Sequence, residues 1–85
     1  MSINELYDIF LKYPKISTDS RHIDIDSIFF ALKGENFNGN RFASIALEKG
    51  AAYSVIDEAD YKIDDRYILV DNVLTTLQEY DINNY

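Results

Sequence analysis

The chain has no cysteine, a single proline, a single histidine and only three glycines among its 85 residues. Without cysteine, neither a disulfide nor a thiolate metal site can hold the fold, which fits a reducing compartment. No stretch approaches the ~20 apolar residues of a membrane span, and the N-terminus has no basic segment followed by an apolar one. We therefore expect a cytoplasmic protein that does not enter a membrane.

Positive charge is also scarce. Fifteen acidic residues stand against eight basic ones, so the net charge is −7 at pH 7. Affinity for nucleic acid or anionic lipid comes mainly from cationic patches, so we expect neither as a partner. A phosphate ligand is not excluded, because Arg21, Lys33 and Arg41 fall close together in the sequence. The alternative is that these three are scattered surface cations.

Residues suited to catalysis or metal binding are few. His22 has no nucleophile and acid beside it in the sequence, and we expect it at the surface. Asp19, Asp24 and Asp26 lack the glycine and the closing glutamate of a calcium loop. Neither the G-x-x-x-x-G-K-[ST] loop nor the G-x-G-x-x-G fingerprint occurs. We expect no catalytic residue, no metal site and no cofactor within these 85 residues.

The apolar residues are sufficient for one small core, with five Phe and seven Tyr in a chain that is 47% hydrophobic. Helical periodicity and short apolar runs predict three helices and four strands. The helices are expected up to residue 13, over 40–49 and over 72–80, and the strands over 15–18, 28–32, 53–56 and 67–70. This order predicts a small layered α/β domain with a mixed sheet of about four short strands.

Turn and cap signals mark the ends of these elements. Asn40 and Asp71 are expected to cap the second and third helices, and Gly50 is expected to end the second. The highly charged segment 57–66 is expected to be a surface excursion. Residues 81–85 have weak helix propensity, and we expect them to fray.

Groups that can bind an anion gather at the ends of the first two strands, where α/β domains hold ligands. Ser17–Arg21 supplies hydroxyls and a guanidinium, and Lys33–Asn40 supplies an ammonium and two glycine-containing turns. Backbone amides around Gly34 and Gly39 can hold a phosphorylated ligand. Phe37, inside the polar loop, either faces a ligand or pins the loop down. It is equally open at this point that all of these are ordinary turn residues.

In their order and spacing, these motifs resemble the N-terminal domain of the Mur ligases, the ATP-dependent enzymes that build the peptide stem of the peptidoglycan precursor. The resemblance covers about residues 16–77. It is carried by Thr18-Asp19-Ser20-Arg21, Phe30-Ala31-Leu32-Lys33-Gly34-Glu35, Phe37-Asn38-Gly39-Asn40 and Gly50-Ala51-Ala52 with Val55-Ile56-Asp57. Asn38 stands where the family more often has Asp, and Asn40 where it more often has His.

The resemblance implies that residues 1–80 bind the UDP end of a UDP-N-acetylmuramoyl-peptide. By their match to the family motifs, the implied UDP-binding residues are Ser20, Arg21, Lys33, Gly34, Glu35, Asn38, Gly39 and Asn40. It also implies that ATP and Mg²⁺ belong to a central domain of a longer parent chain, that further domains of this chain are partners, and that residues 81–85 precede the central domain. The piece alone is then expected to be inactive as a ligase.

The sequence of Ala31–Glu35 is most similar to the corresponding segment of the ligase that adds D-alanyl-D-alanine to UDP-N-acetylmuramoyl-tripeptide. The ligase that adds the third stem residue to UDP-N-acetylmuramoyl-dipeptide is the second candidate, because it shares this domain type. Two further hypotheses stay open. One is a non-catalytic acidic interaction domain that docks a protein through residues 57–66. The second is the related N-terminal domain of a sensor kinase, which keeps the fold without the sugar nucleotide.

Overall fold

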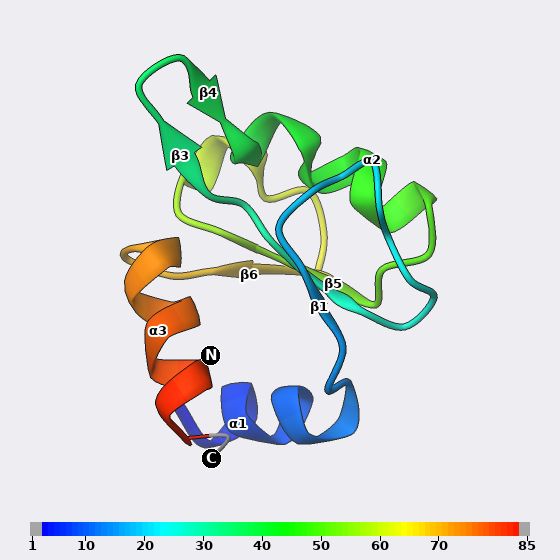
Figure 1. Ribbon diagram of the computed structural model, residues 1–85, viewed down its shortest axis with the longest axis vertical. Helices are drawn as coiled ribbons and strands as arrows, with labels where there is room; N and C mark the ends of the chain where they lie inside the picture. The colour runs from blue at the N-terminus through cyan, green and yellow to red at the C-terminus, as the bar shows by residue number, and fades with distance from the viewer. Residues whose placement is uncertain (1–2, 84–85) are drawn as a thin grey trace.

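The computed structural model describes residues 3–83, which form three α-helices, two 3₁₀ helices, a four-stranded sheet and a separate hairpin (Figure 1). In chain order the elements are α1 (Ile3–Lys12), β1 (Ile16–Ser17), β2 (Ile28–Phe30), β3 (Lys33–Gly34), β4 (Phe37–Asn38), η1 (Gly39–Phe42), α2 (Ala43–Glu48), β5 (Tyr53–Ile56), η2 (Ala59–Tyr61), β6 (Tyr67–Leu69) and α3 (Val73–Asn83). The predicted α/β class is confirmed. Within the described residues, no helix combines the length and the apolar character needed to span a membrane.

The main sheet has the strand order β1-β2-β5-β6, and each neighbouring pair runs parallel. The expectation of a mixed sheet is therefore wrong, because all four strands of the main sheet are parallel. Parallel neighbours require a long connection that returns the chain to the starting end, and segments such as 18–27 and 57–66 provide it. Among the described strands, antiparallel pairing is confined to β3 and β4, which the short turn Glu35-Asn36 joins.

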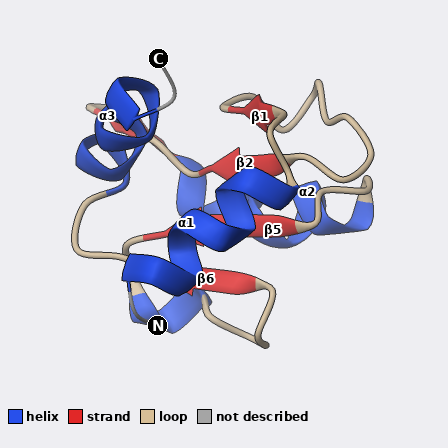
Figure 2. Ribbon diagram, turned by 90° about the horizontal axis from the view of Figure 1, so that it is seen from below, coloured by secondary structure: helices blue, strands red, loops and turns tan. Residues whose placement is uncertain are grey.

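The sheet lies between two helical layers, with α2 on one face and α1 and α3 on the other (Figures 1 and 2). Strand β2 serves both faces, because successive side chains of a strand point in opposite directions. Phe29 packs with buried residues of α2, whereas Ile28 and Phe30 pack with residues of α1 and α3. All three side chains are buried, as the continuous apolar run predicted for a strand covered on both sides.

The helices α1 and α3 are joined by an aromatic contact. The rings of Phe10 and Tyr80 meet edge to face with centroids 4.7 Å apart, and both residues are buried. The Tyr80 hydroxyl also donates a hydrogen bond to the Pro14 carbonyl at 3.0 Å. With Tyr80 anchored in the core, α3 continues to Asn83, beyond the helix end expected at Tyr80. Asn84-Tyr85, the rest of the tail expected to fray, lies outside the described residues.

The N-terminal cap of α3 is Asn72 and not Asp71. The Asn72 side-chain oxygen accepts a hydrogen bond from the Thr75 amide at 2.9 Å. Because α3 begins at Val73, Asn72 stands directly before the first helical residue and Asp71 lies one position too early to cap it.

The expected cap of the second helix, Asn40, lies inside η1, the 3₁₀ helix that precedes α2. The residue that caps η1 is Asn38, whose side-chain oxygen accepts a hydrogen bond from the Asn40 amide at 3.0 Å. The expectation for the other end of α2 is confirmed. Gly50 has a φ of 117°, in the region where a helix commonly ends on glycine because other residues are strained there.

Candidate functional site

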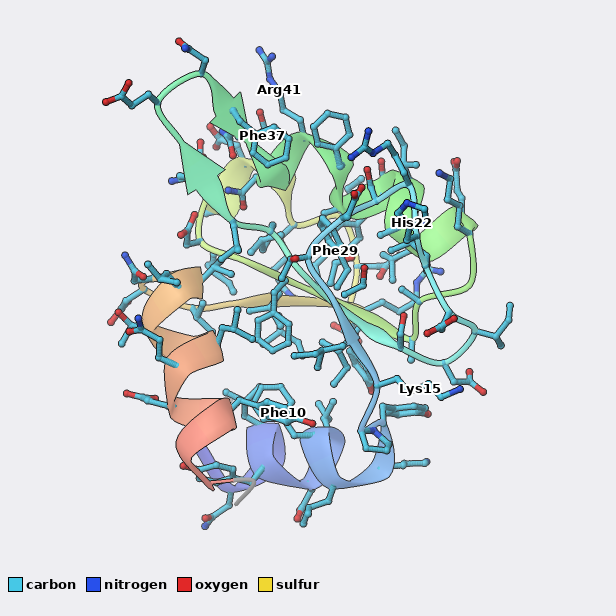
Figure 3. The ribbon with its side chains drawn as sticks, in the orientation of Figure 1. Phe10, Lys15, His22, Phe29, Phe37 and Arg41 are labelled. Atoms are coloured by element: carbon cyan, nitrogen blue, oxygen red, sulfur yellow. The ribbon has the colours of Figure 1, made fainter. Side chains whose placement is uncertain are left out.

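Six of the eight residues predicted to bind UDP line two adjoining cavities beyond the carboxyl ends of β1 and β2. The β1-loop cavity, of about 430 Å³, is lined by Thr18, Asp19, Ser20, Arg21, Phe37 and Phe42. The hairpin cavity, of about 540 Å³, is lined by Lys33, Gly34, Glu35, Asn36, Phe37, Asn38, Arg41 and Glu58. Phe37 lines both cavities and lies at the tip of the molecule that carries the hairpin (Figure 3). Gly39 and Asn40, in contrast, are buried.

In the β1-loop cavity, Arg21 is paired with Asp19. The guanidinium donates to both carboxylate oxygens, from Nε to Oδ1 at 3.1 Å and from Nη2 to Oδ2 at 2.9 Å. These hydrogen bonds from Arg21 lower the pKa of Asp19 to about 2. The Arg21 side chain is 81% exposed, and such an exposed ion pair is weak. A ligand anion can therefore replace Asp19 as the partner of Arg21.

Ser17 shapes the loop that presents Ser20. The Ser17 hydroxyl donates to the His22 carbonyl at 2.8 Å and accepts from the Asp19 amide at 3.3 Å. From the end of α2, the Lys49 ammonium donates to the Ser20 carbonyl at 2.8 Å. The Ser20 hydroxyl has no hydrogen-bond partner among the described residues, so it is available to a ligand. His22 is exposed, as expected.

An aromatic pair separates the two cavities. The rings of Phe37 and Phe42 stack with centroids 5.5 Å apart and an angle of 13° between their planes. Phe42 also packs against the core on the α2 side of the sheet, whereas Phe37 is 49% exposed. The pair therefore both anchors strand β4 and presents an aromatic ring between polar walls, which suits a planar ligand.

Lys33 is held by two carboxylates that were not among the predicted site residues. Its ammonium lies 3.0 Å from Asp57 Oδ1 and 3.1 Å from Glu58 Oε2. The Asp57 side chain is only 9% exposed, and its Oδ2 accepts from the Val73 amide in the first turn of α3 at 3.2 Å. Both acids directly follow β5, the neighbour of β2, and this position at a strand end was the available signal.

Asn38 and Asn40 extend the same network. Asn38 donates from Nδ2 to Glu58 Oε2 at 2.7 Å, and its Oδ1 accepts from Asn40 Nδ2 at 2.9 Å. Asn40 Nδ2 also donates to Asp57 Oδ1 at 3.1 Å, and Asn40 Oδ1 accepts from the Asp57 amide at 3.1 Å. Asn40 is 1% exposed. Each amide uses both its donor and its acceptor inside the protein, so together they fix the hairpin to the end of β5.

The glycines of the hairpin have different environments. Gly34 and Glu35 are exposed at the turn, where the backbone is accessible to a ligand. Gly39 is buried, and its amide donates to the Leu32 carbonyl at 2.7 Å. A Cβ at Gly39 would lie 2.5 Å from the Leu32 carbonyl oxygen and 2.8 Å from the Ala31 carbonyl carbon. Gly39 is therefore required for the close approach of two backbone segments.

Comparison with known proteins identifies the family. A model described as the Mur ligase family, catalytic domain, matches residues 12–83. The chain belongs to the Mur ligase family. The predicted resemblance is thus confirmed, and two of the segments that carried it, Thr18–Arg21 and Lys33–Asn38, supply most of the residues that line the two cavities.

The relatives of this Mur ligase chain include two kinds of ligase. It is 33% identical over 78 residues to the UDP-N-acetylmuramoyl-L-alanyl-D-glutamate--2,6-diaminopimelate ligase of Rickettsia typhi. The aligned residues cover 92% of this chain and 16% of the relative. It is 36% identical over 66 residues to the UDP-N-acetylmuramoyl-tripeptide--D-alanyl-D-alanine ligase of Bacillus subtilis, covering 75% of this chain and 14% of the relative. The chain thus spans about a sixth or less of the length of these relatives.

Solved Mur ligase structures share the fold. The MurF ligase of Thermotoga maritima in complex with ADP superposes with a TM-score of 0.72 at 25% identity, over 84% of this chain and 17% of that one. MurF of Acinetobacter baumannii gives a TM-score of 0.68 at 26% identity, over 85% of this chain and 16% of that one. These similarities agree with the α/β architecture described above.

The polar network of this Mur ligase chain keeps both carboxylates ionised. Hydrogen bonds from Lys33 and then Asn38 lower the pKa of Glu58. Burial acts to raise the pKa of Asp57, but hydrogen bonds from Lys33, Asn40 and the Val73 amide outweigh it, so the pKa of Asp57 is also lowered. A carboxylate whose pKa is lowered by folding stabilises the fold above its unfolded-state pKa, and this stabilisation is lost as the pH falls through the folded-state value.

We accordingly predict that acidification destabilises this Mur ligase chain through Asp57 and Glu58. Their ordinary pKa values are 3.8 and 4.5, so the loss begins near these values and continues below them. In Lys33→Met the shared cation is absent, and stability should fall less between pH 5 and pH 3. Urea unfolding at several pH values measures this. Lys15→Met, at the far end of the molecule from Phe37 (Figure 3), is the control, and a Lys33→Met profile parallel to the control profile would contradict the prediction.

Proposed function

We propose that this chain is the UDP-sugar-binding N-terminal domain of a Mur ligase and holds the uridine diphosphate end of a UDP-N-acetylmuramoyl-peptide. The observation that carries the proposal is the half-exposed Phe37 ring between two polar cavities at the carboxyl ends of parallel strands. A ring in this place can stack on a base, while the polar walls contact sugar and phosphate oxygens. The substrates named for the Rickettsia and Bacillus relatives contain UDP, which has both a base and sugar and phosphate oxygens.

The roles we propose follow exposure. Ser20 and Arg21 donate to the ligand from the β1 loop, Arg21 by exchanging Asp19 for a ligand oxygen. The exposed backbone of Gly34 and Glu35 frames the ligand at the hairpin. Lys33, which is 45% exposed, lines the hairpin cavity and can reach the ligand. Asn38, Gly39 and Asn40 hold the hairpin in place beside it.

For the parent protein we propose the ligase that adds D-alanyl-D-alanine. The sequence of Ala31–Glu35 and the similarity to MurF structures support this proposal. The Rickettsia typhi relative supports the ligase that adds the third stem residue as the second candidate. An assay of the complete protein with dipeptide and tripeptide substrates separates them. Because these 85 residues lack a G-x-x-x-x-G-K-[ST] loop, we place ATP and Mg²⁺ in other parts of the parent, and we expect this chain alone to be inactive.

The proposed function is tested by NMR titration of the isotope-labelled chain with UDP-N-acetylmuramoyl-tripeptide and with UMP. We expect saturable shifts of amides in 17–21 and 33–42, because both segments line the cavities. ATP is the control ligand and should not cause them at equal concentration. Absence of saturable shifts at millimolar ligand, or equal shifts with ATP, would refute the proposal.

Arg21→Ala is expected to weaken binding of UDP-N-acetylmuramoyl-tripeptide about tenfold, because a charge-assisted hydrogen bond to a ligand oxygen is lost. In the complete ligase the same change should raise KM for the UDP substrate more than KM for ATP. Arg66→Ala is the matched control, since Arg66 pairs with Asp64 at 2.9 Å in the same Asp-x-Arg arrangement outside the cavities. Equal losses in the two variants would remove Arg21 from the site.

A further inference from the structure

The three cations beside the two cavities differ in how much of their charge is free. Arg21 is paired with Asp19, and Lys33 lies between Asp57 and Glu58. Arg41 has no carboxylate within ion-pair distance in the part of the chain that the structure describes. It is exposed, and it lines the hairpin cavity together with Phe37. Figure 3 shows its side chain projecting outward beside Phe37.

The charges around Lys33 do not favour an anion. One ammonium is shared by two carboxylates, so the group of three carries a net charge of −1. Asp57 is largely buried and cannot turn away, because its other oxygen is bound to the Val73 amide. An anion that approached Lys33 would meet Glu58 and Asp57 at nearly the same distance, and their repulsion opposes the attraction.

The geometry of Lys33 suits a different kind of ligand atom. An ammonium has three N–H donors, and the two carboxylates at 3.0 Å and 3.1 Å occupy two of them. The Lys33 side chain is 45% exposed and lines the hairpin cavity. The remaining donor can therefore serve a neutral oxygen, such as a carbonyl or a hydroxyl, without loss of either ion pair.

We propose that Arg41 binds a phosphate group of the ligand, and that Lys33 donates to a neutral oxygen of the same ligand. The inference rests on the proposed function and adds Arg41 to its site. The planar guanidinium of Arg41 can donate two parallel hydrogen bonds to one phosphate group. A nucleotide stacked on Phe37 would lie against the cavity that Arg41 lines, so the base would contact the hairpin and the phosphate would contact η1, which directly follows it.

The test compares uridine with UDP, which differ only in the diphosphate. Dissociation constants for both are measured by NMR on the wild-type chain and on Arg41→Ala, Arg41→Lys and Lys33→Met, at one ionic strength. In the wild type UDP should bind more tightly than uridine. In Arg41→Ala we expect the affinity for UDP to fall about tenfold, while the affinity for uridine stays within about twofold of the wild-type value. Arg41→Lys should keep part of the preference for UDP over uridine. Lys33→Met should weaken uridine and UDP by the same factor.

The outcomes separate this inference from the proposed function. The inference is overturned, while the nucleotide site stands, if Arg41→Ala keeps the wild-type ratio of the uridine and UDP dissociation constants. It is also overturned if this ratio falls to about one in Lys33→Met. If the wild-type chain saturates with neither uridine nor UDP, both proposals fail. Lys15→Ala, remote from Phe37 (Figure 3), is the charge-matched control and should change neither constant. The amide spectrum of each variant shows that it is folded before its affinities are compared.

Discussion

Asn40→Ala is expected to lower the free energy of unfolding by about 3 kcal/mol. Asn40 is almost fully buried and makes hydrogen bonds with Asn38, Asp57 and Glu58. Without its side chain, the Asp57 amide loses its acceptor in a partly buried site, and leaving buried polar groups unpaired costs about 1–3 kcal/mol each. For a domain of this size the melting temperature should fall by roughly 12–24 °C.

Urea unfolding of Asn40→Ala against Asn36→Ala measures the effect. Asn36 lies at the exposed turn of the same hairpin and has no hydrogen-bond partner among the described side chains, so its removal is expected to change stability by less than about 0.5 kcal/mol. If the two variants unfold at the same urea concentration, Asn40 is not the link between the hairpin and the end of β5.

Gly39→Ala is the second change with a large expected effect, a loss of about 2–3 kcal/mol. The new methyl group would lie 2.5 Å from the Leu32 carbonyl oxygen, a backbone atom that cannot rotate away as the end of a side chain can. Relief requires the hairpin to move away from Leu32. That movement would stretch the hydrogen bond of 2.7 Å between the Gly39 amide and the same carbonyl.

The matched control for Gly39→Ala is Gly34→Ala. A Cβ at Gly34 meets nothing closer than Phe37 Cβ at 3.9 Å, which is an ordinary contact. The change should be neutral or slightly stabilising, because alanine restricts the unfolded chain. Thermal unfolding of both variants decides the matter, and a loss at Gly39 no larger than the loss at Gly34 would show that the hairpin can shift freely.

The local elements were predictable because their signals lie within a few residues. The apolar run 28–32 indicated a strand buried on both faces, and β2 with its flanking residue Ala31 is buried as expected. Gly50 marked the end of α2 at a positive φ. The cap of α3 was misplaced by one residue, from Asn72 to Asp71, because both residue types are good caps and only the start of the helix distinguishes them.

The candidate site was predictable only in part. The sequence pointed to the segments 17–21 and 33–40, and the structure brings both to cavities that share Phe37. It did not point to Asp57 or Glu58, which belong to a segment read as a surface excursion. A contact between Lys33 and residues more than twenty positions away depends on β2 and β5 being neighbours, and no local pattern encodes that pairing.

Composition and periodicity by themselves determined the α/β class and the approximate element positions, and the motifs in their order carried the resemblance to the Mur ligase family. These properties depend on residues that are close in sequence, or on the order of motifs along the chain, so the amino-acid sequence contains them directly. Only the tertiary structure decided the parallel direction of the four main-sheet strands, the burial of Gly39 and Asn40, and the pairing of Lys33 with Asp57 and Glu58. Each of these properties depends on which distant segments meet in the folded chain, so no pattern of neighbouring residues contains it.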